Sequence, residues 1–244
     1  VIYYPMGSII SAKGLTKRFA GHVALDSIDL DIEQGEFVLI LGPNGAGKTT
    51  FLKILETLMR PSSGSVEIGG LELGKAAVRI RKMIGAISHE SYLYNDLTVE
   101  ENLRFFGKMY GLSDDELTIR IEVLLEQIHL EHRYMDRVST LSRGMKQRLS
   151  IARSLIHDPE IILMDEPYTG LDLQSACDLE KILLENSRRS TVLMVTHEMH
   201  RAFNICDRIV ILCSGKISSD IRRKDIGSVE ELQGFYTKIF EERA

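Results

Sequence analysis

The chain has 244 residues, enough for one large domain or for a core that carries an inserted subdomain. Its hydrophobic content of 44% and charged content of 27% are ordinary for a globular domain and favour neither intrinsic disorder nor a membrane class. Thirty basic residues against 35 acidic ones give a formal net charge of -5, so there is no basic excess to neutralise a nucleic-acid backbone. We therefore expect no nucleic acid among the partners.

Cysteine spacing and hydropathy restrict the cellular setting. Three cysteines without paired spacing argue against a disulfide framework or a zinc site and favour a reducing, cytosolic compartment; they are Cys177, Cys206 and Cys213. No stretch approaches the roughly 20 apolar residues that cross a bilayer, so a membrane role requires a partner. Residues 1–5 contain no initiating Met and no signal-peptide pattern, and we interpret them as a trimmed end.

The N-terminal third predicts an antiparallel flap followed by a strand–loop–helix unit. Residues 9–19 and 23–32 carry partial alternation of apolar and polar residues, with Gly21 between them, which is typical of paired strands. The apolar run 37–41 predicts a buried strand. Residues 50–59 have apolar side chains at helical spacing and predict the helix that follows it.

The middle of the chain has a different pattern. Apolar residues recur at spacings of three and four over residues 98–110, 114–128 and 142–157, and strand patterns are missing there. Thr98 is followed three residues later by Glu101, which is the spacing of a capping box at a helix start. We therefore predict an inserted helical subdomain.

Four more β-branched apolar runs predict parallel core strands, at residues 84–87, 161–164, 192–195 and 209–212. Residues 228–242 carry one apolar helical stripe, which predicts a final helix packed on the core. We expect a single domain over residues 6–244. Its core comprises residues 6–88 and 158–244, and residues 89–157 form the helical subdomain.

A phosphate-binding loop is the strongest motif. The segment 42–49 matches G-x-x-x-x-G-K-T and lies between the first core strand and its helix, which is the context that this motif requires. Glycines let successive amides turn inward, and the helix N-terminus adds partial positive charge, so the loop can wrap a polyphosphate. The residues expected to bind it are Gly42, Pro43, Asn44, Gly45, Ala46, Gly47, Lys48, Thr49 and Thr50. Lys48 pairs with the outer phosphates, and the Thr49 hydroxyl is a ligand for Mg²⁺.

A second acidic motif indicates hydrolysis. The apolar run 161–164 ends in Asp165 and Glu166. Asp165 at the strand tip can hold Mg²⁺, and Glu166 can orient or deprotonate the attacking water. Because both carboxylates end a buried strand downstream of Lys48, we predict that the terminal phosphate of a nucleoside triphosphate is hydrolysed.

Further motifs in a fixed order make the chain resemble the ABC ATPase family over nearly its full length. Residues 141–145 read Leu-Ser-Arg-Gly-Met at the position of that family's signature, residues 168–172 resemble its D-loop, and residues 195–197 resemble its switch-histidine loop. The resemblance implies an α/β fold, namely a P-loop NTPase (RecA-like) core with an N-terminal antiparallel β flap and an inserted helical subdomain. It also implies ATP and Mg²⁺ as cofactors.

The resemblance also implies roles for individual residues. Ser142 and Gly144 would bind the terminal phosphate of the ATP on a second copy, so two copies in head-to-tail arrangement complete two sites. Asp172 would contribute from the D-loop, and His197 would take part in catalysis. Phe19 is similar to the aromatic residue that stacks on adenine, although it equally fits ordinary packing.

The sequence departs from the family pattern in two motifs. Arg143 and Met145 replace a glycine and a glutamine of the signature, while Ser142 stays. His89 stands where the family has a glutamine near Mg²⁺. Imidazole is a poor ligand for this hard cation. We therefore expect His89 to contact the attacking water or to sense a transport partner near the nucleotide.

These motifs together resemble the ATPase subunits of cytochrome c maturation haem exporters. The leading hypothesis is an ATPase that dimerises and drives integral-membrane subunits from the cytoplasmic face of the membrane, with docking around Tyr92, Leu93 and Tyr94. Those three residues equally fit inward packing against the helical subdomain. Two alternatives stay open, namely a soluble ATPase of iron–sulfur cluster assembly and a nucleotide-binding scaffold without turnover.

Overall fold

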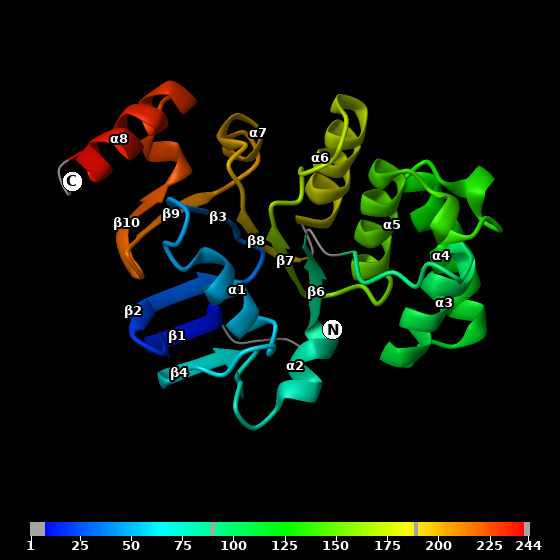
Figure 1. Cartoon of the computed structure of the whole chain (residues 1–244), viewed down its shortest axis with the longest axis horizontal. Coiled ribbons are helices and arrows are strands. Elements are labelled where there is room, and N and C mark those ends of the chain that lie inside the picture. The colour runs from blue at the N-terminus through cyan, green and yellow to red at the C-terminus, as the bar shows by residue number, and fades with distance from the viewer. Residues whose placement is uncertain (1–7, 89–90, 188–189, 242–244) are drawn as a thin grey trace.

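A computed structural model describes residues 8–88, 91–187 and 190–241 (Figure 1). A six-stranded sheet forms the centre, in the strand order β10-β9-β3-β8-β7-β6. Its strands are β3 (Phe37–Leu41), β6 (Ile84–Ile87), β7 (Ile161–Asp165), β8 (Thr191–Val195), β9 (Arg208–Cys213) and β10 (Lys216–Arg222). All neighbours pair in parallel except β10, which runs antiparallel at one edge. The predicted core strands are confirmed, and β10 adds an edge strand that was not predicted.

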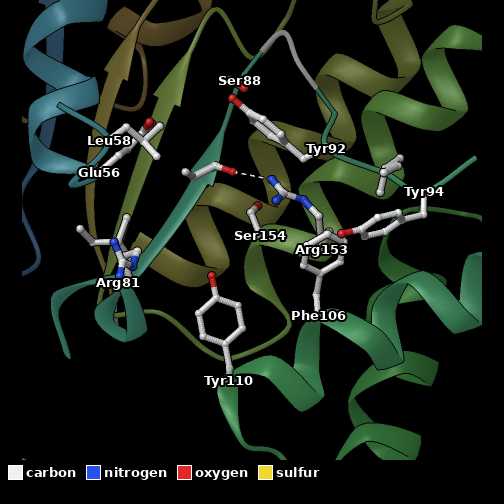
Figure 2. Close-up of a pocket in the computed structure, with 13 residues that line it drawn as sticks. Glu56, Leu58, Arg81, Ser88, Tyr92, Tyr94, Phe106, Tyr110, Arg153 and Ser154 are labelled. Atoms are coloured by element: carbon white, nitrogen blue, oxygen red, sulfur yellow. Dashed lines mark hydrogen bonds between the residues drawn. The ribbon is translucent and has the colours of Figure 1, made fainter. Parts of the chain in front are cut away.

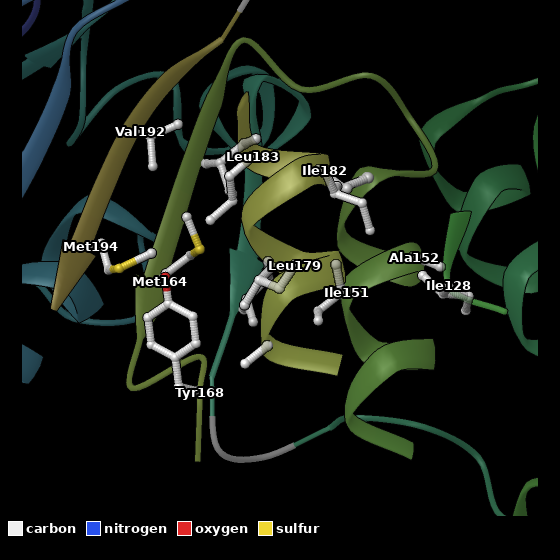
Figure 3. Packing of buried hydrophobic residues seen from close by; sticks show 14 of the residues in the cluster. Ile128, Ile151, Ala152, Met164, Tyr168, Leu179, Ile182, Leu183, Val192 and Met194 are labelled. Atoms are coloured by element: carbon white, nitrogen blue, oxygen red, sulfur yellow. The ribbon is translucent and has the colours of Figure 1, made fainter. Parts of the chain in front are cut away.

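The central strands are apolar on both sides because each side is covered. Along β3, Phe37 and Leu39 pack into one hydrophobic core, whereas Val38 and Ile40 pack into the other. The first core lies between the sheet and a layer of helices, where Met164 faces the apolar side chains of α6 (Leu173–Ser187) (Figure 3). The second core lies between the sheet and the flap.

The flap is a second sheet, in the order β2-β1-β4-β5. Its strands are β1 (Ser8–Phe19), β2 (His22–Glu33), β4 (Ser63–Ile68) and β5 (Leu71–Glu72), and every neighbouring pair is antiparallel. The predicted hairpin is confirmed, with Phe19 opposite His22. Strands β4 and β5 were not predicted, since only Val66 and Ile68 of β4 are buried and a pattern of two residues is too short to recognise.

Helix α1 (Lys48–Leu55) follows β3 after the phosphate loop and begins two residues earlier than predicted. It also ends four residues earlier, because Thr57 adopts a left-handed conformation with φ 62° that a helix cannot continue through. Leu58 consequently lies outside the helix and is largely exposed. The short helix α2 (Ala77–Met83) then leads into β6.

The three predicted middle helices are confirmed within two residues at each end. They are α3 (Val99–Tyr110), α4 (Asp114–Gln127) and α5 (Arg143–Leu155), with short 3₁₀ turns at Glu131–Arg133 and Val138–Thr140. They lie together at one end of the molecule, away from the flap (Figure 1). Thr98 and Glu101 form the predicted capping box, and Ser113 starts α4 with a second one.

The remaining helices cover the sheet face opposite the flap. They are α6, α7 (Met199–Phe203) and α8 (Val229–Glu241), named in chain order toward the C-terminus (Figure 1). A 3₁₀ turn at Arg223–Asp225 precedes α8. The C-terminal helix was predicted, and its Leu232 is fully buried in the core. Across the described ranges, no helix combines the length and apolar character that a membrane crossing needs.

Asn102 fixes the backbone of residues 94–98, just before α3. Its buried side-chain amide accepts a hydrogen bond from the Tyr94 backbone N–H (2.9 Å) and donates to the carbonyl oxygens of Tyr94 (3.0 Å) and Thr98 (2.9 Å). We expect Asn102→Ala to lower the free energy of unfolding by about 2 kcal/mol, because it leaves buried backbone groups unpaired. Urea denaturation measures this. The exposed Thr118→Ala is the control and should change stability by less than about 0.5 kcal/mol; an equal effect of both variants would contradict the assignment.

Candidate nucleotide site

Three neighbouring strands of the central sheet end at one edge. Strand pairing places Ile40 of β3 opposite Val195 of β8, and Val195 opposite Asp165 of β7. The segments that follow these strands therefore start side by side. They are the phosphate loop, the Glu166 segment and the His197 segment, so the topology alone brings the predicted motifs together.

A cavity of about 340 Å³ opens at this edge. Its lining contains Phe19, His22, Ala24, Asn44, Gly45, Ala46, Gly47, Lys48, Thr49, Thr50, Asp165, Glu166, Val195 and His197. Most of the predicted site residues therefore surround one space. His22 and Ala24 were not predicted; the signal that could have found His22 is its place across the two-residue hairpin from Phe19.

Two glycines of the loop are required by their surroundings. Gly47 has φ 102° and precedes the first residue of α1, and a Cβ there would overlap the carbonyl of Ala24 in β2. Gly42 has φ 153°, and a Cβ there would overlap the carbonyl of Leu212 in β9. The loop is thus clamped between the flap and the central sheet, which fixes its amides near the N-terminus of α1.

Lys48 is the buried cation of the cavity. Its Nζ atom donates hydrogen bonds to the carbonyl oxygens of Gly42 (2.6 Å) and Pro43 (3.0 Å), so the ammonium folds back onto its own loop. Burial lowers the pKa of Lys48, and the nearby Glu166 and Asp165 carboxylates oppose that shift. An ammonium held this way favours an anionic ligand, which would replace solvation lost on burial.

Glu166 and His197 are held against each other. Nε2 of His197 lies 3.2 Å from Oε1 of Glu166, and the backbone N–H of His197 donates to Oε2 at 3.2 Å. Glu166 has φ 52°, an uncommon conformation for this residue, and its own N–H donates to the Val195 carbonyl at 2.8 Å. The strained backbone turns the carboxylate away from the strand and towards the cavity.

Thr49 and Asp165 offer oxygen ligands inside the same cavity. Mg²⁺ prefers a few carboxylate or hydroxyl oxygens together with substrate phosphate and water. The described residues contain no cluster of three or more His, Cys, Asp or Glu side chains suited to a metal. One hydroxyl and one carboxylate therefore fit an ion that is brought by a phosphate group, not a metal held by the protein alone.

Phe19 lies at the hairpin end and is 45% exposed. Lys17 places its Nζ atom 5.2 Å from the Phe19 ring centroid, which is a cation–π contact. Phe19 therefore lines the cavity and is accessible to a ligand.

Among the described residues, five predicted ones are absent from the cavity lining: Gly42 and Pro43, whose carbonyl oxygens accept hydrogen bonds from Lys48, and Ser142, Gly144 and Asp172. Ser142 caps α5, and its hydroxyl accepts a hydrogen bond from the N–H of Met145 at 3.2 Å. Asp172 accepts a hydrogen bond from the N–H of Ser175 at 2.8 Å, and this bond lowers its pKa. Within one chain Ser142 and Asp172 therefore contribute to local structure.

Arg143, which replaces a glycine of the signature pattern, contacts another motif of the same chain. The Arg143 side chain lies against Gly170, where the guanidinium occupies the space that a Cβ would need. The signature and the segment 168–172 are thus in contact within one chain. His89, the other departure, lies outside the described residues.

The strand–loop–helix unit, the carboxylate pair and the histidine define a phosphate-loop ATPase of the cassette type. The chain belongs to the ABC transporter family, because the family model described as "ABC transporter" matches residues 25–169, more than half of the chain. It is an ATP-binding transporter subunit and an ATPase.

Curated relatives agree with this assignment. The ABC transporter ATP-binding protein NatA of Bacillus subtilis is 39% identical, over 80% of this chain and 80% of the relative. The Nod factor export ATP-binding protein I of Cupriavidus metallidurans is 38% identical, over 86% of this chain and 70% of the relative. The linearmycin resistance protein LnrL of Bacillus subtilis is 36% identical, over 90% and 71%.

Solved structures agree with the fold. An ATP-binding subunit of an ABC transporter superposes with a TM-score of 0.88 at 30% identity, over 94% of this chain and all of the other. The dimeric post-hydrolysis state of the ATP-binding cassette MJ0796, bound to ADP and Pi, gives a TM-score of 0.81 at 30% identity, over 88% of this chain and 98% of the other. The predicted fold class is confirmed.

Replacing Lys48 with Met should weaken ATP binding about 10- to 100-fold, because the buried charge that faces the phosphates is lost. Titration with a fluorescent ATP analogue measures this. Lys53→Met is the matched control, since it removes an exposed lysine from the same helix and should leave the affinity unchanged. Equal affinities of Lys48→Met and the wild type would show that the loop does not hold the phosphates.

Proposed function

We propose that two copies of this chain close head to tail around two Mg-bound ATP molecules and that hydrolysis reopens them. The phosphate loop of one copy binds each triphosphate, and Ser142 and Gly144 of the other copy close over it. Two observations support the proposal: these residues lie outside the cavity of their own chain, and a structurally similar cassette is a dimer bound to ADP and Pi. A head-to-tail pair with two equal interfaces is a closed C2 dimer.

The hydrolytic step rests on one observation, the pairing of Glu166 with His197 beside the phosphate loop. In the proposed mechanism the Glu166 carboxylate takes a proton from the attacking water. The backbone N–H of His197 holds that carboxylate in place, and the imidazole would donate to a phosphate oxygen once the ligand is bound, while Lys48 offsets the charge of the outer phosphates. Mg²⁺ held by Thr49 and Asp165 would stabilise the developing charge on the phosphate oxygens.

Replacing Glu166 with Gln should lower ATP turnover by at least about 100-fold while ATP binding persists, since removal of a general base costs roughly 10²- to 10⁴-fold. Because unhydrolysed ATP keeps the dimer closed, the variant should elute as a dimer with ATP on size exclusion. The exposed Glu185→Gln is the control and should behave as the wild type. Unchanged turnover in Glu166→Gln would refute the base assignment, and no phosphate release from the wild type with its partner would favour the scaffold alternative.

We further propose that the chain works on integral-membrane subunits, on the cytoplasmic side of the membrane. Residues 91–97 lead into α3. They include a side chain that packs inward and side chains that are exposed, which are the two possibilities raised for Tyr92, Leu93 and Tyr94. Leu93 packs against the core, whereas Tyr92 is 54% exposed and Tyr94 is 50% exposed. Tyr94 and Phe105 form an edge-to-face pair with centroids 5.0 Å apart, so two aromatic rings are presented together at the surface.

Replacing Tyr94 with Glu should release the chain from its membrane subunits while its basal ATPase activity persists, because a charge would be buried at the docking surface. The measurement is recovery of the detergent-solubilised complex beside turnover of the isolated chain. Tyr134→Glu is the matched control, a tyrosine that is 41% exposed on another part of the helical region. An unchanged complex with Tyr94→Glu would place docking elsewhere.

The class of transported cargo can be inferred from the identity of the membrane subunit. The resemblance to haem-exporter ATPases rests on the signature, the His89 segment and residues 165–172. The relatives reported above are named for Nod factor export and linearmycin resistance and give that assignment no support. Identification of the membrane subunit that copurifies in detergent tests both the cargo class and the iron–sulfur alternative. Recovery of the native complex without detergent would favour the latter.

We also propose the division of residues 6–244 into a nucleotide-binding core, residues 6–88 with 158–244, and a helical subdomain, residues 89–157. The grouping of α3, α4 and α5 at one end of the molecule supports it (Figure 1). The described residues between β6 and β7 contain helices and turns but no strand, which supports it as well.

A further inference from the structure

The helix that follows His197 is short and depends on its neighbours. Helix α7 spans only Met199–Phe203, and the backbone N–H of Met199 donates to the His197 carbonyl at 2.9 Å, so His197 and α7 move together. A helix of five residues has little stability of its own. The place of α7, and with it the place of His197, is therefore set by side chains that reach other elements.

Two apolar side chains anchor α7 to the core. Ala202 and Phe203 are buried in the same hydrophobic core as one face of the central sheet. Hydrophobic contact is non-directional. It holds α7 down on the sheet, but it does not fix how far α7 lies from the neighbouring helix α6.

Arg201 supplies directional contacts between α7 and its neighbours. Its Nη1 atom donates to Oε1 of Glu180 in α6 at 2.7 Å, and the two side chains are only 24% and 25% exposed. Its guanidinium also lies over the Tyr168 ring, 5.8 Å from the centroid, which is a cation–π contact. Because the ion pair is partly buried, salt and water screen it less than an exposed pair.

Tyr168 belongs to the segment of Glu166. It lies two residues after that carboxylate, and the N–H of Thr169 donates to the Glu166 carbonyl at 3.1 Å, which closes a turn around it. The Tyr168 ring is buried in the same hydrophobic core as Met164 (Figure 3). Arg201, four residues after His197, thus contacts the segment that carries the other member of the Glu166–His197 pair.

We propose that Arg201 is a positioning residue that keeps the His197 imidazole beside the Glu166 carboxylate, by tying α7 to Tyr168 and Glu180. Arg201 does not line the nucleotide cavity, so its effect reaches the phosphate through His197. Nε2 of His197 lies 3.2 Å from Oε1 of Glu166, and a shift of α7 by about 1 Å would separate them beyond hydrogen-bond range. The inference rests on the proposed function, because it takes His197 as part of the hydrolytic machinery.

Replacing Arg201 with Met should lower kcat about tenfold and leave KM within about twofold, because the phosphate loop still binds ATP whereas the histidine is misplaced. Arg201→Lys keeps a cation next to Glu180 and should retain at least about half of the activity. Arg104→Met is the matched control. Arg104 is 28% exposed and pairs with Glu100 on α3, and its loss should leave kcat unchanged. Steady-state phosphate release by the full chain measures all of these.

A double variant separates positioning from a general structural role. His197→Ala alone should lower kcat at least about 100-fold, the effect of losing one donor to the transition state. If Arg201 acts through His197, adding Arg201→Met to His197→Ala should lower kcat by less than about twofold more, because the residue that it positions is already gone. Thermal unfolding shows whether each variant is folded.

Two results would overturn the inference. One is an unchanged kcat in Arg201→Met while His197→Ala loses activity, which refutes the role of Arg201 alone. The other is a further tenfold loss in the double variant, which would mark Arg201 as structural. Full activity in His197→Ala would instead refute the proposed hydrolytic step, and this inference with it.

Discussion

The whole site depends on the parallel pairing of β3, β8 and β7. Parallel strands carry their C-terminal ends to one edge of a sheet, so segments that lie more than a hundred residues apart in the chain start next to one another there. The register is fixed because both faces of these strands are buried, and a shift by one residue would exchange the two hydrophobic cores. Catalytic geometry is thus set by packing far from the ligand.

The sequence was most informative where a pattern has one physical meaning. The phosphate loop, the carboxylates after an apolar strand and the Thr98 capping box all depend on short-range spacing, and each lies where it was predicted. The five core strands were also recognised, since buried parallel strands are continuous apolar runs. The order of motifs then predicted the family, which the family model confirms.

Other features are not visible as a spacing pattern, because they depend on long-range contacts, on an obscured helical stripe or on the conformation of one residue. Helix α6 went unrecognised although Leu179 and Leu183 pack on the sheet, because its polar residues obscure the stripe. Strand β4 owes its pairing to β1, and the early end of α1 follows from the backbone of Thr57. The interaction of Glu166 with His197 joins two strand ends and becomes visible only when the sheet is assembled.

Helix α1 contacts two cavities: Lys48 at its first position lines the nucleotide cavity, and Glu56 at its C-terminal cap lines a cavity of about 560 Å³ between the central sheet and the middle helices (Figure 2). A helix of eight residues spans only about 12 Å, and its buried face leaves little freedom to bend. If a displacement at one end of α1 alters the other end, the binding of ATP and the binding of the partner are thermodynamically linked. The factor by which ATP changes the affinity for the partner then equals the factor by which the partner changes the affinity for ATP. Measuring nucleotide affinity with and without the membrane subunit would therefore report the coupling energy of the transport cycle directly.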